Sequence, residues 1–256
     1  MQNSRAVYAR ATVAVGIFGL VVTFAPLAKA AEIKILTPRA VATVLQEIGS
    51  EFERTTGNKL IVSIDLGGAL VTRVKAGEAF DVLVAGASRF DELIKDGKII
   101  ENTRTTLVRA GLGVEVRAGA PKPDIGSVEA FKRALLNAKS IAYLKEGSGA
   151  EAARIVERLG IAEAIKSKLM RPETDIVSEL VGKGEIELGI IVITQILTTP
   201  GVELVGPLPP EIQSYTVFAA GVSARSSVPD AAGALIKFLM GATALPVIKS
   251  QGMEPG

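Results

Sequence analysis

The sequence predicts an α/β protein with two lobes, each built on a doubly wound and mostly parallel sheet. Short β-rich apolar runs alternate with segments of helical periodicity, and glycine-containing loops join one to the next. Repeated strand–loop–helix units produce parallel sheets, because each helix returns the chain to the same end of the sheet. An extended segment followed by a Pro-Lys-Pro turn at 121–123 separates one group of units from another, which predicts the second lobe.

The first thirty residues have the composition of a secretory signal peptide. Arg5 and Arg10 precede an apolar run over 11–25, and an Ala-x-Ala pattern predicts cleavage near Ala30 and Ala31. A membrane anchor is the alternative, but about fifteen apolar residues fall short of the roughly 20 that span a bilayer. Because the sequence has no cysteine, no lipid anchor is expected.

The composition of the predicted mature chain favours binding over catalysis. The sequence has 29 Lys and Arg against 27 Asp and Glu, and removal of residues 1–30 with Arg5, Arg10 and Lys29 leaves 26 against 27. Such a balance gives no general attraction to nucleic acid or to an anionic membrane. The absence of cysteine and histidine excludes thiol catalysis, Cys-ligated zinc and an imidazole base. Neither a metal site nor a cofactor is predicted.

Three strand–loop–helix units follow residue 31. The strands are expected at 33–36, 60–64 and 81–85, and the helices between and after them are expected to end at Gly57, Gly77 and Gly97. Ligands of parallel sheets bind at the carboxyl ends of the strands. The loops at 37–40, 67–69 and 86–88 all lie at that edge, so they form one side of a candidate site.

The second group of units begins after an extended segment at 105–117. The expected elements are a helix from Ser127, a strand at 140–144, a helix after the glycine loop 147–149, a helix capped by Asp175, a buried strand at 188–193, a returning strand at 215–222 and two helices from Asp230 and Leu245. The predicted division is a signal peptide over 1–30, a first lobe over 31–112 and 214–256, and a second lobe over 113–213.

Arg39 is the most informative residue of the first loop. It follows Pro38, where the first strand gives way to a helix. Free N–H groups and the positive end of the helix dipole favour an anion at such a junction. The planar guanidinium matches a carboxylate or an oxyanion. A solvated arginine just inside a helix is the alternative interpretation.

Eight segments spread over nearly all of the predicted mature chain carry a family resemblance. They are 31–36, 52–57, 67–70, 77–83, 111–114, 158–161, 184–190 and 252–256. In these segments the chain resembles the periplasmic molybdate-binding proteins, which are solute-binding components of ABC importers. The resemblance implies a type II periplasmic-binding-protein fold, with two α/β lobes joined by two crossing strands and closing over a ligand. It also implies a periplasmic location and an importer permease as partner, and we expect a monomer.

The resemblance further implies which residues hold the ligand. Family members bind a tetrahedral oxyanion with hydroxyl and backbone N–H groups, and the corresponding positions here are Thr37, Arg39, Gly67, Gly68, Ala69, Ser148, Gly149, Ile193 and Thr194. Serines expected in the first two loops and a tyrosine near the last position are absent. Because a buried charge without a partner is costly, Arg39 is expected to face a ligand carboxylate. The ligand is thus a small anion, either a molybdate-like or tungstate-like oxyanion or, favoured by Arg39, an organic carboxylate.

Each of these residues also has a structural interpretation. Ser148 and Thr194 can be ordinary helix caps, and the glycines can merely permit tight turns. An enzyme on the same fold is a further alternative, since aconitate isomerase, which interconverts trans- and cis-aconitate, resembles this family. Such a proton shift needs a cationic clamp and a base but no cofactor. Arg39 would be the clamp, and Lys145 and Glu146 are the nearest candidates for the base, although both can equally be solvated loop residues.

Overall fold

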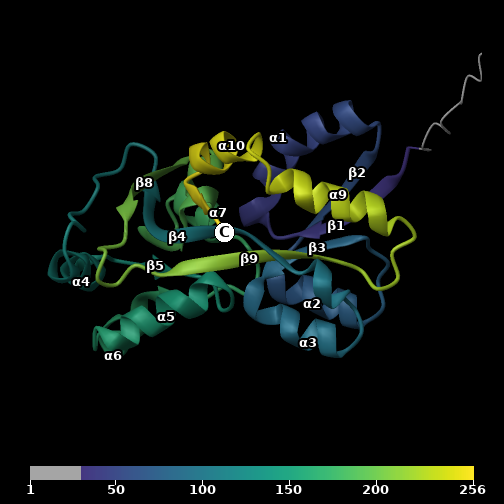
Figure 1. Cartoon of the computed structure of the whole chain (residues 1–256). Helices are drawn as coiled ribbons and strands as arrows, with labels where there is room; N and C mark the ends of the chain where they lie inside the picture. Colours follow the sequence, from purple (N-terminus) through teal and green to yellow (C-terminus); the bar gives the residue numbers. More distant parts are fainter. Residues whose placement is uncertain (1–29) are drawn as a thin grey trace, which may run out of the picture.

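Strands and helices alternate along much of the chain (Figure 1). The structure is a computed structural model, and it describes residues 30–256. The predicted signal peptide therefore lies almost entirely outside the described residues. Within residues 30–256 no single helix is long and apolar enough to cross a membrane. Only when α9 (Pro229–Leu239) and α10 (Ala244–Ser250), which are bent relative to each other, are taken together do their length and composition meet that requirement.

The first lobe is built on three parallel strands. β1 (Glu32–Thr37) pairs in parallel with β2 (Lys59–Ile64) and with β3 (Val82–Gly86). The connecting helices are α1 (Arg39–Thr56), α2 (Gly67–Lys75) and α3 (Phe90–Lys95). The apolar stripe of α1 is buried, and its Phe52 packs edge-on against Phe238 of α9 with ring centroids 5.4 Å apart. Gly57 ends α1 in the left-handed conformation, at a φ of 75° that favours glycine.

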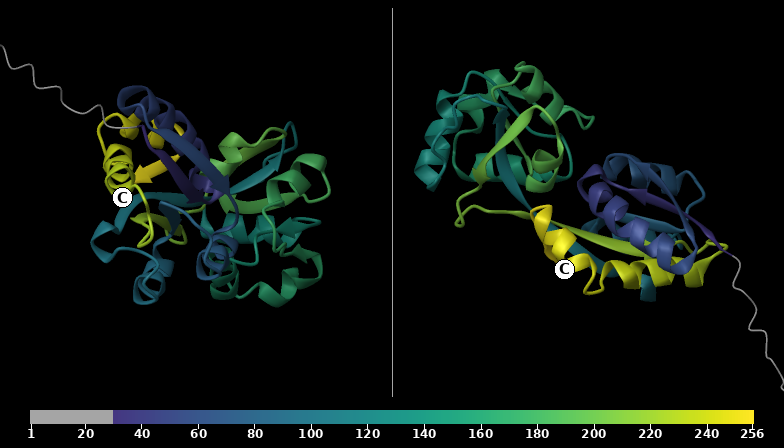
Figure 2. Two further views of the ribbon diagram at one scale, coloured as in Figure 1. Left: turned by 90° about the vertical axis from the view of Figure 1, so that its right-hand side faces the viewer. Right: turned by 90° about the horizontal axis from the view of Figure 1, so that it is seen from above.

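Two strands connect the lobes. β4 (Thr105–Arg117) pairs antiparallel with β9 (Tyr215–Val222) along its first half and with β7 (Leu188–Val192) and β8 (Val202–Pro207) along its second half. At the crossing, the Gln213 amide accepts a hydrogen bond from the Leu112 N–H at 3.1 Å and donates one to the Leu112 carbonyl at 3.0 Å. Figure 2 shows the lobes as two bodies spanned by these strands.

The second lobe is centred on β7, whose five residues are all buried. β7 pairs in parallel with β5 (Ile141–Ala142), and β5 in turn pairs with β6 (Leu169–Met170). The helices of this lobe are α4 (Val128–Asn137), α5 (Ser148–Arg158), α6 (Ala162–Ile165), α7 (Val177–Lys183) and α8 (Ile193–Thr198). The helix expected from Ser127 is α4, and the Ser127 hydroxyl caps it by accepting a hydrogen bond from the Ala130 N–H.

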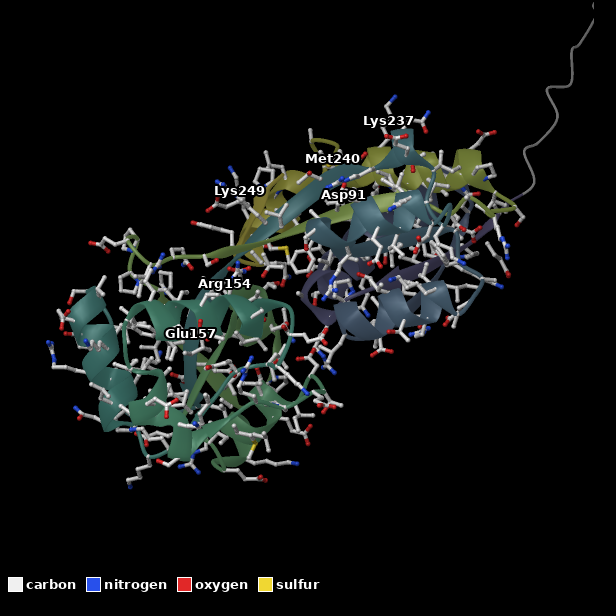
Figure 3. The ribbon with its side chains drawn as sticks, turned by 90° about the horizontal axis from the view of Figure 1, so that it is seen from below. Asp91, Arg154, Glu157, Lys237, Met240 and Lys249 are labelled. Atoms are coloured by element: carbon white, nitrogen blue, oxygen red, sulfur yellow. The ribbon has the colours of Figure 1, made fainter. Side chains whose placement is uncertain are left out.

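The end of the chain returns to the first lobe. α9 and α10 pack against α1, and β10 (Met253–Pro255) pairs antiparallel with β4. Figure 3 shows Lys237 and Met240 at the first lobe, on and just after α9, and Arg154 and Glu157 on α5 of the second lobe. The predicted two-lobed α/β fold is confirmed. Its parallel strands lie at the outer ends of the sheet, and the antiparallel pairs occur where β4 and β9 cross between lobes.

A carboxyl group lies buried inside the second lobe. Glu115 of β4 is 0% exposed, and both of its carboxyl oxygens lie within 3.0 Å of the Ser178 hydroxyl on α7. Gly189 of β7 leaves the necessary room, since a methyl group added there would lie 2.6 Å from Glu115 Cγ. Burial raises the pKa of Glu115 to about 7, with a further rise from nearby Asp175 and an opposing effect of the Ser178 hydrogen bond.

We expect Glu115→Gln to remove a pH dependence of stability. The pKa of Glu115 is higher in the folded chain, about 7, than in the unfolded chain, about 4.3. The folded state therefore binds more protons between these values, and the free energy of unfolding falls as pH rises. The wild type should lose about 2–3 kcal/mol between pH 5 and pH 8 through this group.

Urea unfolding of wild type and variant at both pH values measures this difference. Glu115→Gln should show a smaller loss than the wild type, whereas Glu163→Gln, at a side chain that is 87% exposed, should leave the loss unchanged. Equal pH dependence in wild type and Glu115→Gln would contradict the raised pKa.

Candidate functional site

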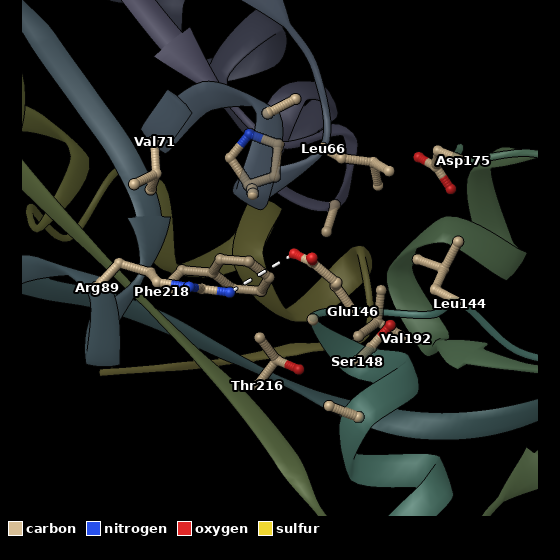
Figure 4. Close-up of a pocket in the computed structure, with 18 of the residues that line it drawn as sticks. Leu66, Val71, Arg89, Leu144, Glu146, Ser148, Asp175, Val192, Thr216 and Phe218 are labelled. Atoms are coloured by element: carbon tan, nitrogen blue, oxygen red, sulfur yellow. Dashed lines mark ion pairs between the residues drawn. The ribbon is translucent and has the colours of Figure 1, made fainter. Parts of the chain in front are cut away.

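A cleft of about 1110 Å³ opens between the two lobes (Figure 4). The first lobe lines it with residues 38–40, 65–69, 86–89 and 215–218, among others, and the second lobe with residues 144–148, 150–151, 172–173, Asp175, Val192 and Gln195. Pockets for small molecules usually measure about 300–1,000 Å³. This cleft therefore has room for an organic acid.

Three helices begin at the cleft without side-chain caps. They are α1, α2 and α5, whose first residues are Arg39, Gly67 and Ser148. In α2 the first helical hydrogen bond is donated by the Leu70 N–H to the Leu66 carbonyl, at 2.9 Å. The three N–H groups before Leu70 therefore have no acceptor within the helix. Gly147 turns the chain into α5 at a φ of 61°, which favours glycine. The starts of these helices favour an anion in the cleft.

Arg39 lines the cleft and forms an ion pair across it. Its Nε lies 3.0 Å from Asp175 Oδ2 of the second lobe, and the Gln195 amide nitrogen lies 2.8 Å from both Asp175 oxygens. The premise of a buried and unpartnered arginine is therefore wrong, since the Arg39 side chain is 58% exposed and has Asp175 as a partner. The prediction that Asp175 caps a helix is also wrong, because α7 begins at Val177 with no side-chain cap.

A second arginine, which the sequence analysis did not single out, faces the cleft from the same lobe. Arg89 follows β3, and its guanidinium lies 3.6 Å from the Glu146 carboxylate of the second lobe (Figure 4). Arg89 could have been predicted from the sequence, because it directly follows the loop 86–88 at the ligand-binding edge of the sheet. Arg39 and Arg89 thus both carry ion pairs that join the two lobes.

The other cations of the cleft have acidic partners within their own lobe. Lys145 Nζ lies 2.5 Å from Glu173 Oε1, and Lys75 and Arg154 pair with Glu92 and Glu151. The hydrogen bond and charge of Glu173 raise the pKa of Lys145, while Lys145 lowers the pKa of Glu173. This environment favours the protonated form of Lys145, which does not favour it as a base at neutral pH.

Two of the hydroxyl groups that line the cleft, those of Ser148 and Thr216, are buried. Ser148 is 8% exposed at the start of α5. The Thr216 hydroxyl oxygen on β9 is buried and has no hydrogen-bond partner within residues 30–256. Figure 4 shows Ser148, Thr216 and Glu146 around the same part of the cleft. Thr216 was not predicted, because the sequence analysis treated its strand only as a return to the first lobe.

The predicted site residues divide into two groups. Those that line the cleft are Arg39, Gly67, Gly68, Ala69, Lys145, Glu146 and Ser148. The remaining four do not line the cleft; Thr37, Gly149 and Thr194 are buried, and Ile193 is partly buried. The Thr194 hydroxyl donates to the Ala40 carbonyl at 3.4 Å, and the Thr37 hydroxyl donates to the Pro38 carbonyl at 3.3 Å.

Ile193 and Gly149 have packing roles in the structure. A methyl group at Gly113 of β4 would lie 2.8 Å from the Ile193 side chain, so Ile193 fills the space that this glycine leaves. Gly149 packs its α-carbon against the Leu144 backbone. In residues 30–256 no group of three or more His, Cys, Asp or Glu side chains is placed to hold a metal ion.

Comparison with known proteins identifies relatives along most of the chain. The family model for bacterial extracellular solute-binding proteins matches residues 33–254. An aconitate isomerase from a Pseudomonas species is 29% identical over 227 residues, which cover 86% of this chain and 87% of that protein. The molybdate-binding protein ModA of Azotobacter vinelandii is 29% identical over 237 residues, which cover 88% of this chain and 90% of that protein.

A solved structure shows the same architecture. The periplasmic molybdate-binding protein of Azotobacter vinelandii superposes with a TM-score of 0.75 at 17% identity, over 88% of this chain and 99% of that one. The two-lobed fold is thus that of the type II periplasmic binding proteins, as the resemblance implied. This chain belongs to the bacterial extracellular solute-binding protein family, with molybdate-binding proteins and an aconitate isomerase among its relatives.

Proposed function

We propose that this protein captures a small organic carboxylate in its cleft and delivers it to the permease of an ABC importer. The observation that carries the proposal is the pair of arginines, Arg39 and Arg89, on one wall of a cleft where three uncapped helices begin. Guanidinium groups bind carboxylates through paired hydrogen bonds, and helix starts add further N–H donors. A periplasmic location and a monomeric state belong to the same proposal.

Asp175 supports this assignment by orienting Arg39. Held by Gln195 on one side, the Asp175 carboxylate fixes the guanidinium through its Nε. The Arg39 side chain is nevertheless 58% exposed and lines the cleft, so it remains accessible to a ligand. On the opposite wall, Ser148 and the start of α5 offer a hydroxyl and N–H groups that reach the ligand when the lobes close.

Thermal unfolding of residues 31–256 with a panel of anions tests the proposal. The panel is molybdate, tungstate, citrate, cis-aconitate and trans-aconitate. A carboxylate present at about 100 times its Kd should add about 2.7 kcal/mol of stability and raise the Tm by roughly 5–10 °C. A shift with molybdate and tungstate alone would overturn the carboxylate assignment and favour an oxyanion carrier.

Aconitate isomerisation is a second candidate function. It is favoured by the relative of that name and by Glu146, a carboxylate that lines the cleft beside Arg89. Of the two bases considered from the sequence, Glu146 is the better one, because the pKa of Lys145 is raised by Glu173. Incubating the protein with trans-aconitate and following cis-aconitate by proton NMR tests this activity. Turnover that Glu146→Gln abolishes would establish the enzyme, and absence of turnover would leave the carrier.

A further inference from the structure

We propose that Glu146 is an intramolecular competitor of the ligand, occupying beside Arg89 the subsite that a second ligand carboxylate takes. The proposal rests on the carboxylate-binding function above and deepens it. In the ligand-free protein the Glu146 carboxylate neutralises Arg89 from the opposite lobe. A ligand can bind Arg89 only after one of its carboxylates displaces Glu146. The protein therefore selects anions with at least two carboxylates, one to bind Arg39 and one to bind Arg89.

The position of Glu146 matches that of a bound carboxylate. Its oxygen lies 3.6 Å from the Arg89 guanidinium. The same carboxylate sits against the first turn of α2, because a methyl group added at Gly68 would collide with Glu146 Oε2 and lie 3.4 Å from Cδ. The Glu146 carboxylate thus lies between Arg89 and the start of α2, whose first N–H groups have no side-chain cap.

Buried hydroxyls border this position without being used by Glu146. The Thr216 hydroxyl oxygen has no hydrogen-bond partner within the described chain, although it is buried. Ser148, 8% exposed, lines the cleft two residues after Glu146. Buried polar groups normally have partners, so an unpartnered hydroxyl in a cleft indicates a polar ligand there.

The two ion pairs between the lobes differ in how easily they open. Asp175 is 16% exposed, lies 3.0 Å from Arg39 and is held by Gln195. Glu146 is 64% exposed, and its 3.6 Å contact with Arg89 exceeds an ordinary hydrogen-bond length. Exposed ion pairs of this kind contribute little and are screened by water. The carboxylate of Glu146 is therefore displaceable, whereas that of Asp175 stays with its arginine.

Calorimetric titration of Glu146→Gln with citrate and trans-aconitate tests the proposal. Removing the competitor should tighten binding about two- to fivefold, the range that corresponds to one exposed ion pair. Glu163→Gln is the matched control, because Glu163 is also paired with a cation and is 87% exposed, but it does not line the cleft. The control makes the same change in net charge and should leave the affinity within twofold.

Adding Gly68→Ala to the Glu146→Gln variant tests the location of the subsite. The new methyl group fills the space that Glu146 occupies, so the gain in affinity should be lost. Weaker binding in Glu146→Gln, or an equal gain in Glu163→Gln, would overturn the competitor role while leaving the carboxylate carrier intact. Failure of the wild type to bind any carboxylate would instead overturn the proposed function itself.

Discussion

Replacing Arg39 by alanine should weaken carboxylate binding by roughly 30- to 5,000-fold, with little change in melting temperature. Truncating one partner of a hydrogen-bonded charge pair in a binding site costs about 2–5 kcal/mol, or roughly 30- to 5,000-fold in Kd. The effect on folding should be small, because the Arg39 side chain is 58% exposed and Gln195 still donates hydrogen bonds to Asp175 after Arg39 is removed. Calorimetric titration and a thermal melt of the same sample separate the two effects.

The matched control for this substitution lies on the same helix. Arg54 is at the far end of α1, pairs with Glu51 and is 72% exposed, so Arg54→Ala removes an equal charge away from the cleft. Its carboxylate affinity should match that of the wild type. If Arg39→Ala binds citrate or aconitate as tightly as Arg54→Ala does, Arg39 serves only to pair with Asp175.

The place of the cleft could be predicted from the sequence because topology determines it. Strand–loop–helix units put the loops after β1, β2 and β3 at one edge of the sheet, and residues 38–40, 67–69 and 86–88 line the cleft. Helix ends were equally predictable where a glycine with positive φ follows, as at Gly57 and Gly184.

The charge pairs of the cleft could not be predicted, because each depends on how the two lobes are placed. Arg39 and Asp175 are far apart in sequence, and the local pattern around Asp175 is that of a helix cap. The pairing of Arg89 with Glu146 has the same origin. A sequence pattern places a charged residue at an edge of the sheet, whereas its partner is set by the fold of the other lobe.

Whether a hydroxyl group at a strand end faces the ligand could not be predicted from the sequence, for a different reason. Thr37 and Thr194 lie at the predicted edge, but their hydroxyls donate to backbone carbonyls inside the protein. A threonine hydroxyl can donate a hydrogen bond to a nearby backbone carbonyl or bind a ligand, and the spacing of residues does not distinguish these two roles. Ser148, at the start of a helix facing the cleft, is the predicted hydroxyl that does line it.

Replacing Gly149 by alanine should destabilise the protein by about 3 kcal/mol and lower its Tm by roughly 6–12 °C. A methyl group at this position would overlap the Leu144 carbonyl and lie 2.7 Å from Leu144 Cα. Because these are backbone atoms, no change of side-chain rotamer relieves the clash. The loop 145–147, which carries Glu146, must then shift relative to the start of α5.

Gly233→Ala on α9 is the matched control, since no atom lies within 4 Å of the added methyl group. There the substitution should stabilise the helix by about 0.5–1 kcal/mol, because glycine loses more backbone entropy than alanine. Thermal melts of both variants, with and without citrate, decide what Gly149 does. A wild-type Tm combined with lost binding would show that Gly149 meets the ligand, as the sequence predicted. A lowered Tm in the absence of any ligand would show that its lack of a side chain is needed for α5 to pack against the Leu144 backbone.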